Sequence, residues 1–128
     1  MRHWHFRDYV DGAGQNQIRI WLDSEPLKVQ MRIDALIRNL EVAERLWEPH
    51  VKVLKGECKG LIELRIKINK IQYRPLAYYG PIRRQITLLY GAIEKGDRFE
   101  PKNSCEIALE RRALIESGFA STCPHEFD

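Results

Sequence analysis

Two arginines, Arg65 and Arg74, offer the clearest chemistry in this sequence of 128 residues. Residues 62–68 alternate between aliphatic and charged side chains, and the alternation resumes after Asn69-Lys70. This pattern predicts a β-hairpin with one apolar face, and Asn suits a two-residue turn because it tolerates a positive φ. With that turn, Arg65 lies opposite Arg74 on the face away from the aliphatic residues. Two neighbouring guanidinium groups can hold phosphate oxygens bidentately.

The predicted Arg65–Arg74 pair has two interpretations. Like charges opposite each other destabilise a sheet by some tenths of a kcal/mol, so an anion is expected beside them. That anion is either a phosphate of RNA, held from solvent, or the nearby carboxylate of Glu63, in an internal ion network. Arginines buried under a helix, or locked to carboxylates of the same chain, would end the proposal of a ribonuclease that depends on them.

Positive charge is concentrated in residues 51–102. This segment carries twelve Lys and Arg against five Asp and Glu, a net charge of +7, whereas the remainder has a net charge of −4. Such asymmetry favours an anionic partner, although a solvated sheet face explains it as well. Lys52, Lys55 and Lys95 extend the cationic surface, and each taken singly is also explained as a solvated lysine.

The totals and the missing motifs narrow the class of protein. The length indicates one domain, residues 1–128, with a loose tail from 119 to 128. No apolar run approaches the ~18 residues of a membrane span, and the start lacks the apolar stretch of a signal peptide, so a cytoplasmic location is expected. Cys58, Cys105 and Cys123 are an odd set without zinc spacing and are expected to be reduced. No cofactor or metal is expected.

The elements that position these residues follow from hydrophobic periodicity. We predict a first strand over 3–10, a short helix over 17–22, and a longer helix capped by Ser24 and ended by Pro49. Strands are predicted over 51–54, 61–68, 71–79 and 84–93. A capping box at Asn103 begins a final helix, and Gly118 ends it.

The order of several segments resembles the HigB-like, phage-derived branch of the RelE/ParE toxin superfamily. The resemblance lies in Lys52-Val53-Leu54-Lys55-Gly56, Gly60-Leu61-Ile62-Glu63-Leu64-Arg65-Ile66, Tyr73-Arg74-Pro75-Leu76 and the run from Ile86 to Lys95. It implies a RelE-like α+β fold, with N-terminal helices packed on a small, mainly antiparallel sheet and a C-terminal helix.

The resemblance also implies a function. It is that of a type II toxin, an endoribonuclease that cleaves mRNA on the ribosome by metal-independent 2′-OH attack and is neutralised by a HigA-like helix-turn-helix antitoxin. Carried to matching positions, the catalytic residues are Arg65, Arg74 and Lys95. The residues expected to contact RNA are Lys52, Lys55, Lys67, Tyr78 and Arg98.

Two other functions stay open. One is a ParE-like inhibitor of DNA gyrase, which uses the same fold without RNA chemistry. The other is a non-catalytic phage or prophage binding protein on the same scaffold. Relatives often end the last strand with paired lysines and a threonine, whereas this chain has Glu94-Lys95-Gly96-Asp97, which favours the non-catalytic protein.

Overall fold

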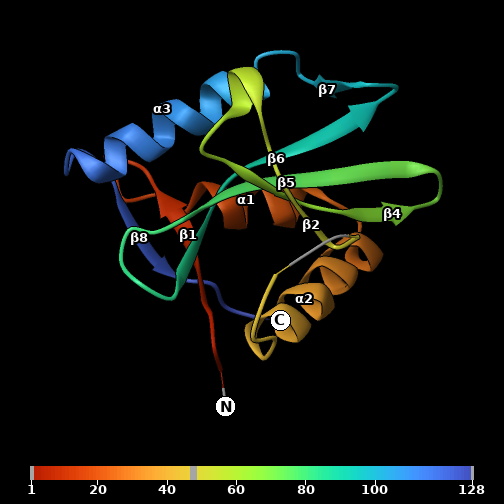
Figure 1. Cartoon of the computed structure of the whole chain (residues 1–128), viewed down its shortest axis with the longest axis horizontal. Helices are drawn as coiled ribbons and strands as arrows, with labels where there is room; N and C mark the ends of the chain where they lie inside the picture. Colours follow the sequence, from red (N-terminus) through yellow and green to blue (C-terminus); the bar gives the residue numbers. More distant parts are fainter. Residues whose placement is uncertain (1, 47–48, 128) are drawn as a thin grey trace.

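The computed structural model describes residues 2–46 and 49–127, in which three α-helices accompany one sheet (Figure 1). The helices are α1 (Gln17–Ser24), α2 (Leu27–Glu41) and α3 (Ser104–Glu116), and a 3₁₀ turn, η1, spans Gly56–Cys58. The strands are β1 (His5–Val10), β2 (Val51–Val53), β3 (Ile62–Leu64), β4 (Ile66–Ile68), β5 (Ile71–Tyr79), β6 (Gln85–Lys95), β7 (Arg98–Glu100) and β8 (Ser121–Pro124).

The sheet is mostly antiparallel and open. Its order is β2-β3-β5-β6-β1-β8, with β4 also pairing with β5 and β7 with β6. Only β1 and β6 pair in parallel among the described strands. The predicted α+β class, with N-terminal helices on a mainly antiparallel sheet and a C-terminal helix, is therefore confirmed. No helix in the described ranges is long and apolar enough to cross a membrane.

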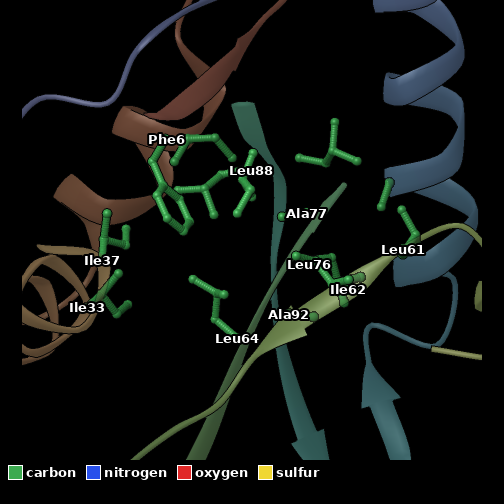
Figure 2. Close-up of a cluster of buried hydrophobic side chains, with 14 of the residues drawn as sticks. Phe6, Ile33, Ile37, Leu61, Ile62, Leu64, Leu76, Ala77, Leu88 and Ala92 are labelled. Atoms are coloured by element: carbon green, nitrogen blue, oxygen red, sulfur yellow. The ribbon is translucent and has the colours of Figure 1, made fainter. Parts of the chain in front are cut away.

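Both faces of the sheet are covered. Helices α1 and α2 lie on one face and α3 lies on the other, as Figures 1 and 2 show. The core between α2 and the sheet contains Ile33, Ile37 and Leu64, all fully buried. The prediction of one apolar and one solvated face is wrong for the central strands, because residues of both parities along β5 are buried.

The β4–β5 hairpin forms as predicted. Asn69 and Lys70 have φ of 51° and 69°, and the ladder runs from the Ile68–Ile71 pair to the Ile66–Tyr73 pair. The pairs Glu63–Leu76 and Ile66–Tyr73 have the predicted register, in which Arg65 is opposite Arg74, but Arg65 itself belongs to no strand. The long strand predicted over 61–68 is divided at Arg65 into β3 and β4, and the Arg65 N–H donates to the carbonyl of His50, next to β2, at 2.9 Å.

Helix α2 is shorter than predicted. It ends at Glu41, whose carbonyl accepts hydrogen bonds from the N–H groups of His3 and Trp4. These bonds direct the segment before β1 onto the end of α2. Ser24 does not cap this helix, because its hydroxyl donates to the carbonyl of Trp21 at 2.6 Å. Trp47, predicted on the same helix, lies outside the described residues.

The segment after Phe119 is ordered, so the predicted loose tail is wrong for 119–127. Strand β8 pairs with β1, and the next residue, His125, is buried between two carboxylates. Its Nδ1 lies 2.7 Å from Asp8 Oδ1 and its Nε2 lies 2.9 Å from Asp34 Oδ1. The C-terminal segment is thereby attached to both β1 and α2.

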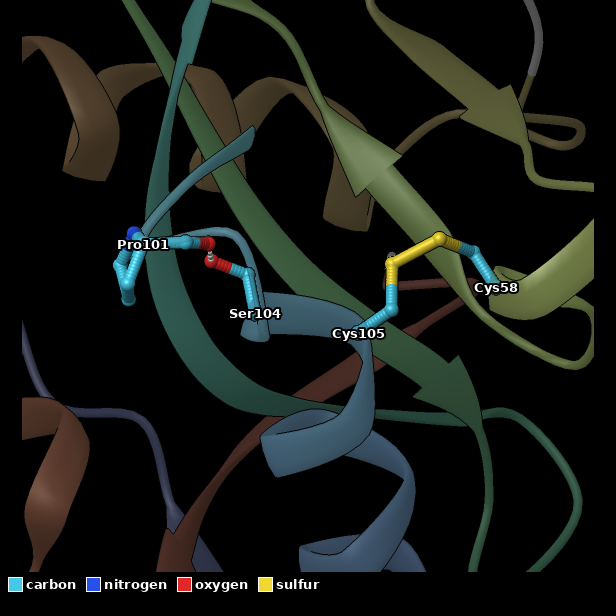
Figure 3. The surroundings of a disulfide bond; sticks show 4 residues. All are labelled: Cys58, Pro101, Ser104 and Cys105. Atoms are coloured by element: carbon cyan, nitrogen blue, oxygen red, sulfur yellow. Dashed lines mark hydrogen bonds between the residues drawn. A yellow bond between two sulfur atoms is a disulfide. The ribbon is translucent and has the colours of Figure 1, made fainter. Parts of the chain in front are cut away.

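A disulfide joins Cys58 of η1 to Cys105 in the first turn of α3 (Figure 3), so the expectation of reduced thiols is wrong for this pair. The two Cα atoms are 5.2 Å apart, although 47 positions separate them in sequence. Helix α3 begins after Asn103 as predicted, but the predicted capping box is wrong, because the Asn103 side chain makes no capping hydrogen bond. The hydroxyl of Ser104 donates to the carbonyl of Pro101 at 2.5 Å. Cys123 is free.

Candidate functional site

Four neighbouring strands place polar side chains on one face of the sheet, and β7 adds an aromatic one. Lys52 of β2 pairs with Glu63 of β3, and Glu94 of β6 pairs with Phe99 of β7. Arg74 of β5 lies between them, because Glu63 pairs with Leu76 and Glu94 with Gln72. Paired residues of antiparallel strands face the same side, and so do alternate residues of one strand. The row therefore crosses the sheet on the α3 side.

Arg74 is at the centre of this row and is buried, with 3% of its surface exposed. Its Nε donates to Glu94 Oε1 at 3.0 Å and lies 3.0 Å from Glu63 Oε2. Its terminal nitrogens donate to Gln72 Oε1 at 2.6 Å and to the carbonyl of Tyr73 at 3.0 Å. The predicted projection of Arg74 into solvent is wrong, and the alternative of an internal ion network is confirmed. A ribonuclease that acts through an exposed Arg74 is therefore ruled out.

Glu63 has the most unusual environment in the row. The residue is 4% exposed, and its buried Oε2 accepts no hydrogen bond from the described residues. Burial raises the pKa of Glu63 above its ordinary value, and the charge of Glu94 raises it further, while Arg74, Arg65 and Lys52 oppose this rise. Oε2 is nevertheless ion-paired, with Arg74 Nε at 3.0 Å and Arg65 Nε at 3.5 Å. A carboxylate with a raised pKa is suited to accept a proton.

A cavity of about 260 Å³ opens over Glu63. Cations and carboxylates surround it together with two apolar side chains, and its lining consists of Lys52, Leu54, Glu63, Glu94, Asp97, Arg98 and Phe99. Lys52 and Arg98 are exposed at its rim. A phosphate at this rim would meet two positive charges above a buried proton acceptor.

The other predicted site residues are not gathered here. The side chain of Arg65 is 31% exposed, its Nε lies 3.5 Å from Glu63 Oε2, and it lines a separate cavity with Lys67 on the α2 side. The Lys95 side chain is 71% exposed and pairs with Glu100 at 3.5 Å. Lys55 is exposed just before η1.

Tyr78 cannot stack on a base in this conformation, so that expectation is wrong. The residue is 2% exposed, and the guanidinium of Arg112 lies 4.8 Å from its ring centroid. Its hydroxyl is buried and has no hydrogen-bond partner among the described residues. Helix α3 covers Tyr78. The prediction had treated this face of the sheet as open to solvent.

Glu94 and Phe99 were missed as site residues, and Glu63 was considered only as a neighbour of the arginines. The sequence does contain a signal for Glu63, since it occupies the same face as Arg65 in the alternating pattern. Phe99 gives no such signal, because β7 is only three residues long. Among the residues that the structure describes, no group of three or more His, Cys, Asp or Glu could hold a metal ion.

Comparison with known proteins gives one match. The model of a family described as phage-derived protein Gp49-like (DUF891) matches residues 20–113, which include the whole row from Lys52 to Phe99. No curated protein and no solved structure matches.

Proposed function

This chain belongs to the Gp49-like family of phage-derived proteins, which are commonly toxin-like, and we propose that it is the toxin of a type II toxin–antitoxin system. More specifically, we propose that it is a RelE-like protein of the HigB branch and an endoribonuclease that acts on mRNA at the ribosome. Its partner is a small HigA-like helix-turn-helix antitoxin, expected to be acidic where it meets the cationic segment 51–102.

One observation carries the ribonuclease proposal: Glu63, a buried carboxylate that is ion-paired with Arg74 and Arg65, lines the same cavity as Lys52 and Arg98. RNA cleavage without a metal needs a proton acceptor for the 2′-OH and positive charge at the phosphate. The raised pKa of Glu63 makes its carboxylate a stronger base than an ordinary one. The cavity therefore combines both requirements.

The proposed reaction begins when Glu63 takes the proton of the 2′-OH. The 2′ oxygen then forms a bond to phosphorus, and the bond from phosphorus to the 5′ oxygen breaks. The leaving oxygen takes a proton from solvent, so the products are a 2′,3′-cyclic phosphate and a 5′-OH. Lys52 and Arg98 stabilise the negative charge that develops on the phosphate oxygens.

Arg74 has a different role from the one expected. Its guanidinium holds Glu63 and Glu94 in place and does not reach the phosphate, so it is a positioning residue. Lys55, Lys67 and Lys95 stay candidates for contacts along the RNA backbone, because all three are exposed. Arg65 lies beside Glu63 and contributes positive charge to its surroundings.

A second candidate function is a non-catalytic binding protein on the same scaffold. It is favoured by the neutralisation of Arg74 within the chain, which leaves this arginine no free charge for a transition state. The two candidates share the cationic rim, and they differ in whether RNA bound there is cut.

The ends of the RNA products separate the candidates. Single-stranded RNA is incubated with the purified protein in a chelator without ribosomes, and in a magnesium buffer with ribosomes, and the fragments are analysed by mass spectrometry. We expect 2′,3′-cyclic phosphate and 5′-OH ends. RNA that stays intact under both conditions, while the protein still binds it, would support the binding protein and reject the ribonuclease.

A further inference from the structure

A second cavity of about 330 Å³ adjoins the one over Glu63. Arg98 and Phe99 line both cavities, so the two spaces meet at β7. RNA whose phosphate lies at Lys52 and Arg98 would place a neighbouring nucleotide at or beyond Phe99. The second cavity is therefore on the path of the chain.

The walls of the second cavity suit a flat ring. Phe99 from β7 lines it together with both half-cystines of the Cys58–Cys105 disulfide, where η1 meets the first turn of α3 (Figure 3). The aromatic ring and the polarisable sulfurs are good partners for the π-face of a nucleobase. The disulfide holds η1 beside α3, so the width of the cavity is set by a covalent bond.

Two charged side chains complete the cavity. Glu57 and Lys102 line it, and both are exposed. A carboxylate can accept from the amino group of a base, and an ammonium can bind the next phosphate. A purely apolar ligand would leave these charges unused, whereas a nucleotide provides a partner for each.

We propose that this cavity is a subsite for an unpaired nucleobase, which stacks on Phe99 beside the phosphate held over Glu63. The proposal rests on the proposed function for its ligand class, single-stranded RNA. It adds that one base of the substrate leaves the RNA stack and enters the protein, with Lys102 at the following phosphate. Phe99 is thus a binding residue, and its stacking contributes to RNA affinity only when a base occupies the cavity.

The test uses short RNAs that carry the fluorescent base 2-aminopurine at successive positions. They are titrated into the Glu63→Gln variant, which is expected not to cut them. We expect strong quenching at one position, loss of that quenching in Phe99→Ala, and a Kd about tenfold weaker. Phe99→Tyr keeps the quenching. Phe119→Ala, which removes a side chain exposed beyond the end of α3, changes nothing.

An abasic nucleotide at the quenched position provides a check that leaves the protein unaltered. In protein that retains Phe99, the abasic RNA should bind more weakly than the intact RNA by about the factor that Phe99→Ala causes. In the Phe99→Ala variant the abasic nucleotide should cause no further loss. Additive losses, or equal quenching with and without Phe99, would overturn the subsite. RNA cutting by the wild type without Phe99-dependent quenching rejects the subsite alone, whereas quenching without cutting supports it and rejects the ribonuclease.

Discussion

At the scale of single residues, Arg74 shows how burial changes the role of a charged group. An exposed arginine is free to bind phosphate, but this one donates to two side chains and one carbonyl within the protein. Breaking a buried ion pair leaves the partner charge without compensation, which costs more than the pair contributes when intact. Arg74 therefore stabilises the site and does not itself bind the phosphate.

Arg74→Ala is expected to destabilise the fold by about 3 kcal/mol, because it leaves the buried carboxylate of Glu63 without its closest cation. Urea unfolding measures the loss. Arg83→Ala removes an exposed arginine from the β5–β6 turn and serves as the matched control, expected to change stability by less than about 0.5 kcal/mol. Equal stability of the two variants would contradict the internal network.

His125 makes stability depend on pH. Burial alone would lower the pKa of His125, but its hydrogen bonds to Asp34 and Asp8 and their charges raise it to about 9. The folded pKa is above the unfolded one, so this contribution is complete below about pH 6.5 and is lost as pH rises through about 9. The difference corresponds to about 3 kcal/mol.

Unfolding in urea at pH 6 and pH 9.5 tests this dependence. The wild type should lose stability over that range, and His125→Gln should lose much less, because glutamine does not titrate. His50→Gln, at an exposed position before β2, should behave like the wild type. A wild type and His125→Gln with the same pH dependence would show that His125 is not charged in the fold.

At the scale of elements, the turns and strands that depend only on neighbouring residues in the sequence could be predicted. The Asn69-Lys70 turn and strand β5 were located correctly, because turn chemistry and alternation are local signals. The burial of Arg74 was not foreseen, since it depends on α3 covering the second face of the sheet. Alternation cannot show that a polar face is covered by a distant helix.

The same limit applies to the contacts that join distant segments. The Cys58–Cys105 disulfide spans 47 positions, and His125 meets Asp8 and Asp34 across most of the chain. Nothing in the local sequence around these residues indicates their partners. The cation-rich segment was correctly identified, but the cavity within it depends on β7, a strand too short to show a pattern.

Loss of the disulfide should destabilise the protein by about 4 kcal/mol, the chain-entropy cost expected for a loop of this length. The Cys58→Ser/Cys105→Ser double variant, or the wild type in a dithiol reductant, is compared with the oxidised wild type in thermal unfolding. Cys123→Ser leaves the bridge intact and is the control. Equal midpoints for oxidised and reduced wild type would contradict a formed disulfide.

At the scale of the whole molecule, the net charge of +3 hides a strongly basic segment. If Lys52, Arg98 and Lys102 each contact one phosphate, single-stranded RNA should bind about 20-fold more weakly at 200 mM salt than at 50 mM. Lys52→Gln should reduce the slope of log K against log salt by about 0.7. Lys70→Gln, at the tip of the β4–β5 hairpin, should leave the slope unchanged. A slope that Lys52→Gln does not alter would place the RNA elsewhere.

The whole fold brings one buried carboxylate and two rim cations from β2, β3 and β7 around a single cavity. The account depends on that carboxylate accepting a proton during RNA cleavage. Glu63→Gln keeps the size of the side chain but removes the base, whereas Glu44→Gln alters an exposed carboxylate after α2 that lines neither cavity and is the matched control.

The most direct measurement is the single-turnover rate of RNA cleavage by these two variants and the wild type, with folding checked by circular dichroism. We expect Glu63→Gln to slow cleavage by about 100-fold or more, the usual contribution of a general base, and Glu44→Gln to stay within about threefold of the wild type. Cleavage by a folded Glu63→Gln protein at the wild-type rate would contradict the central claim.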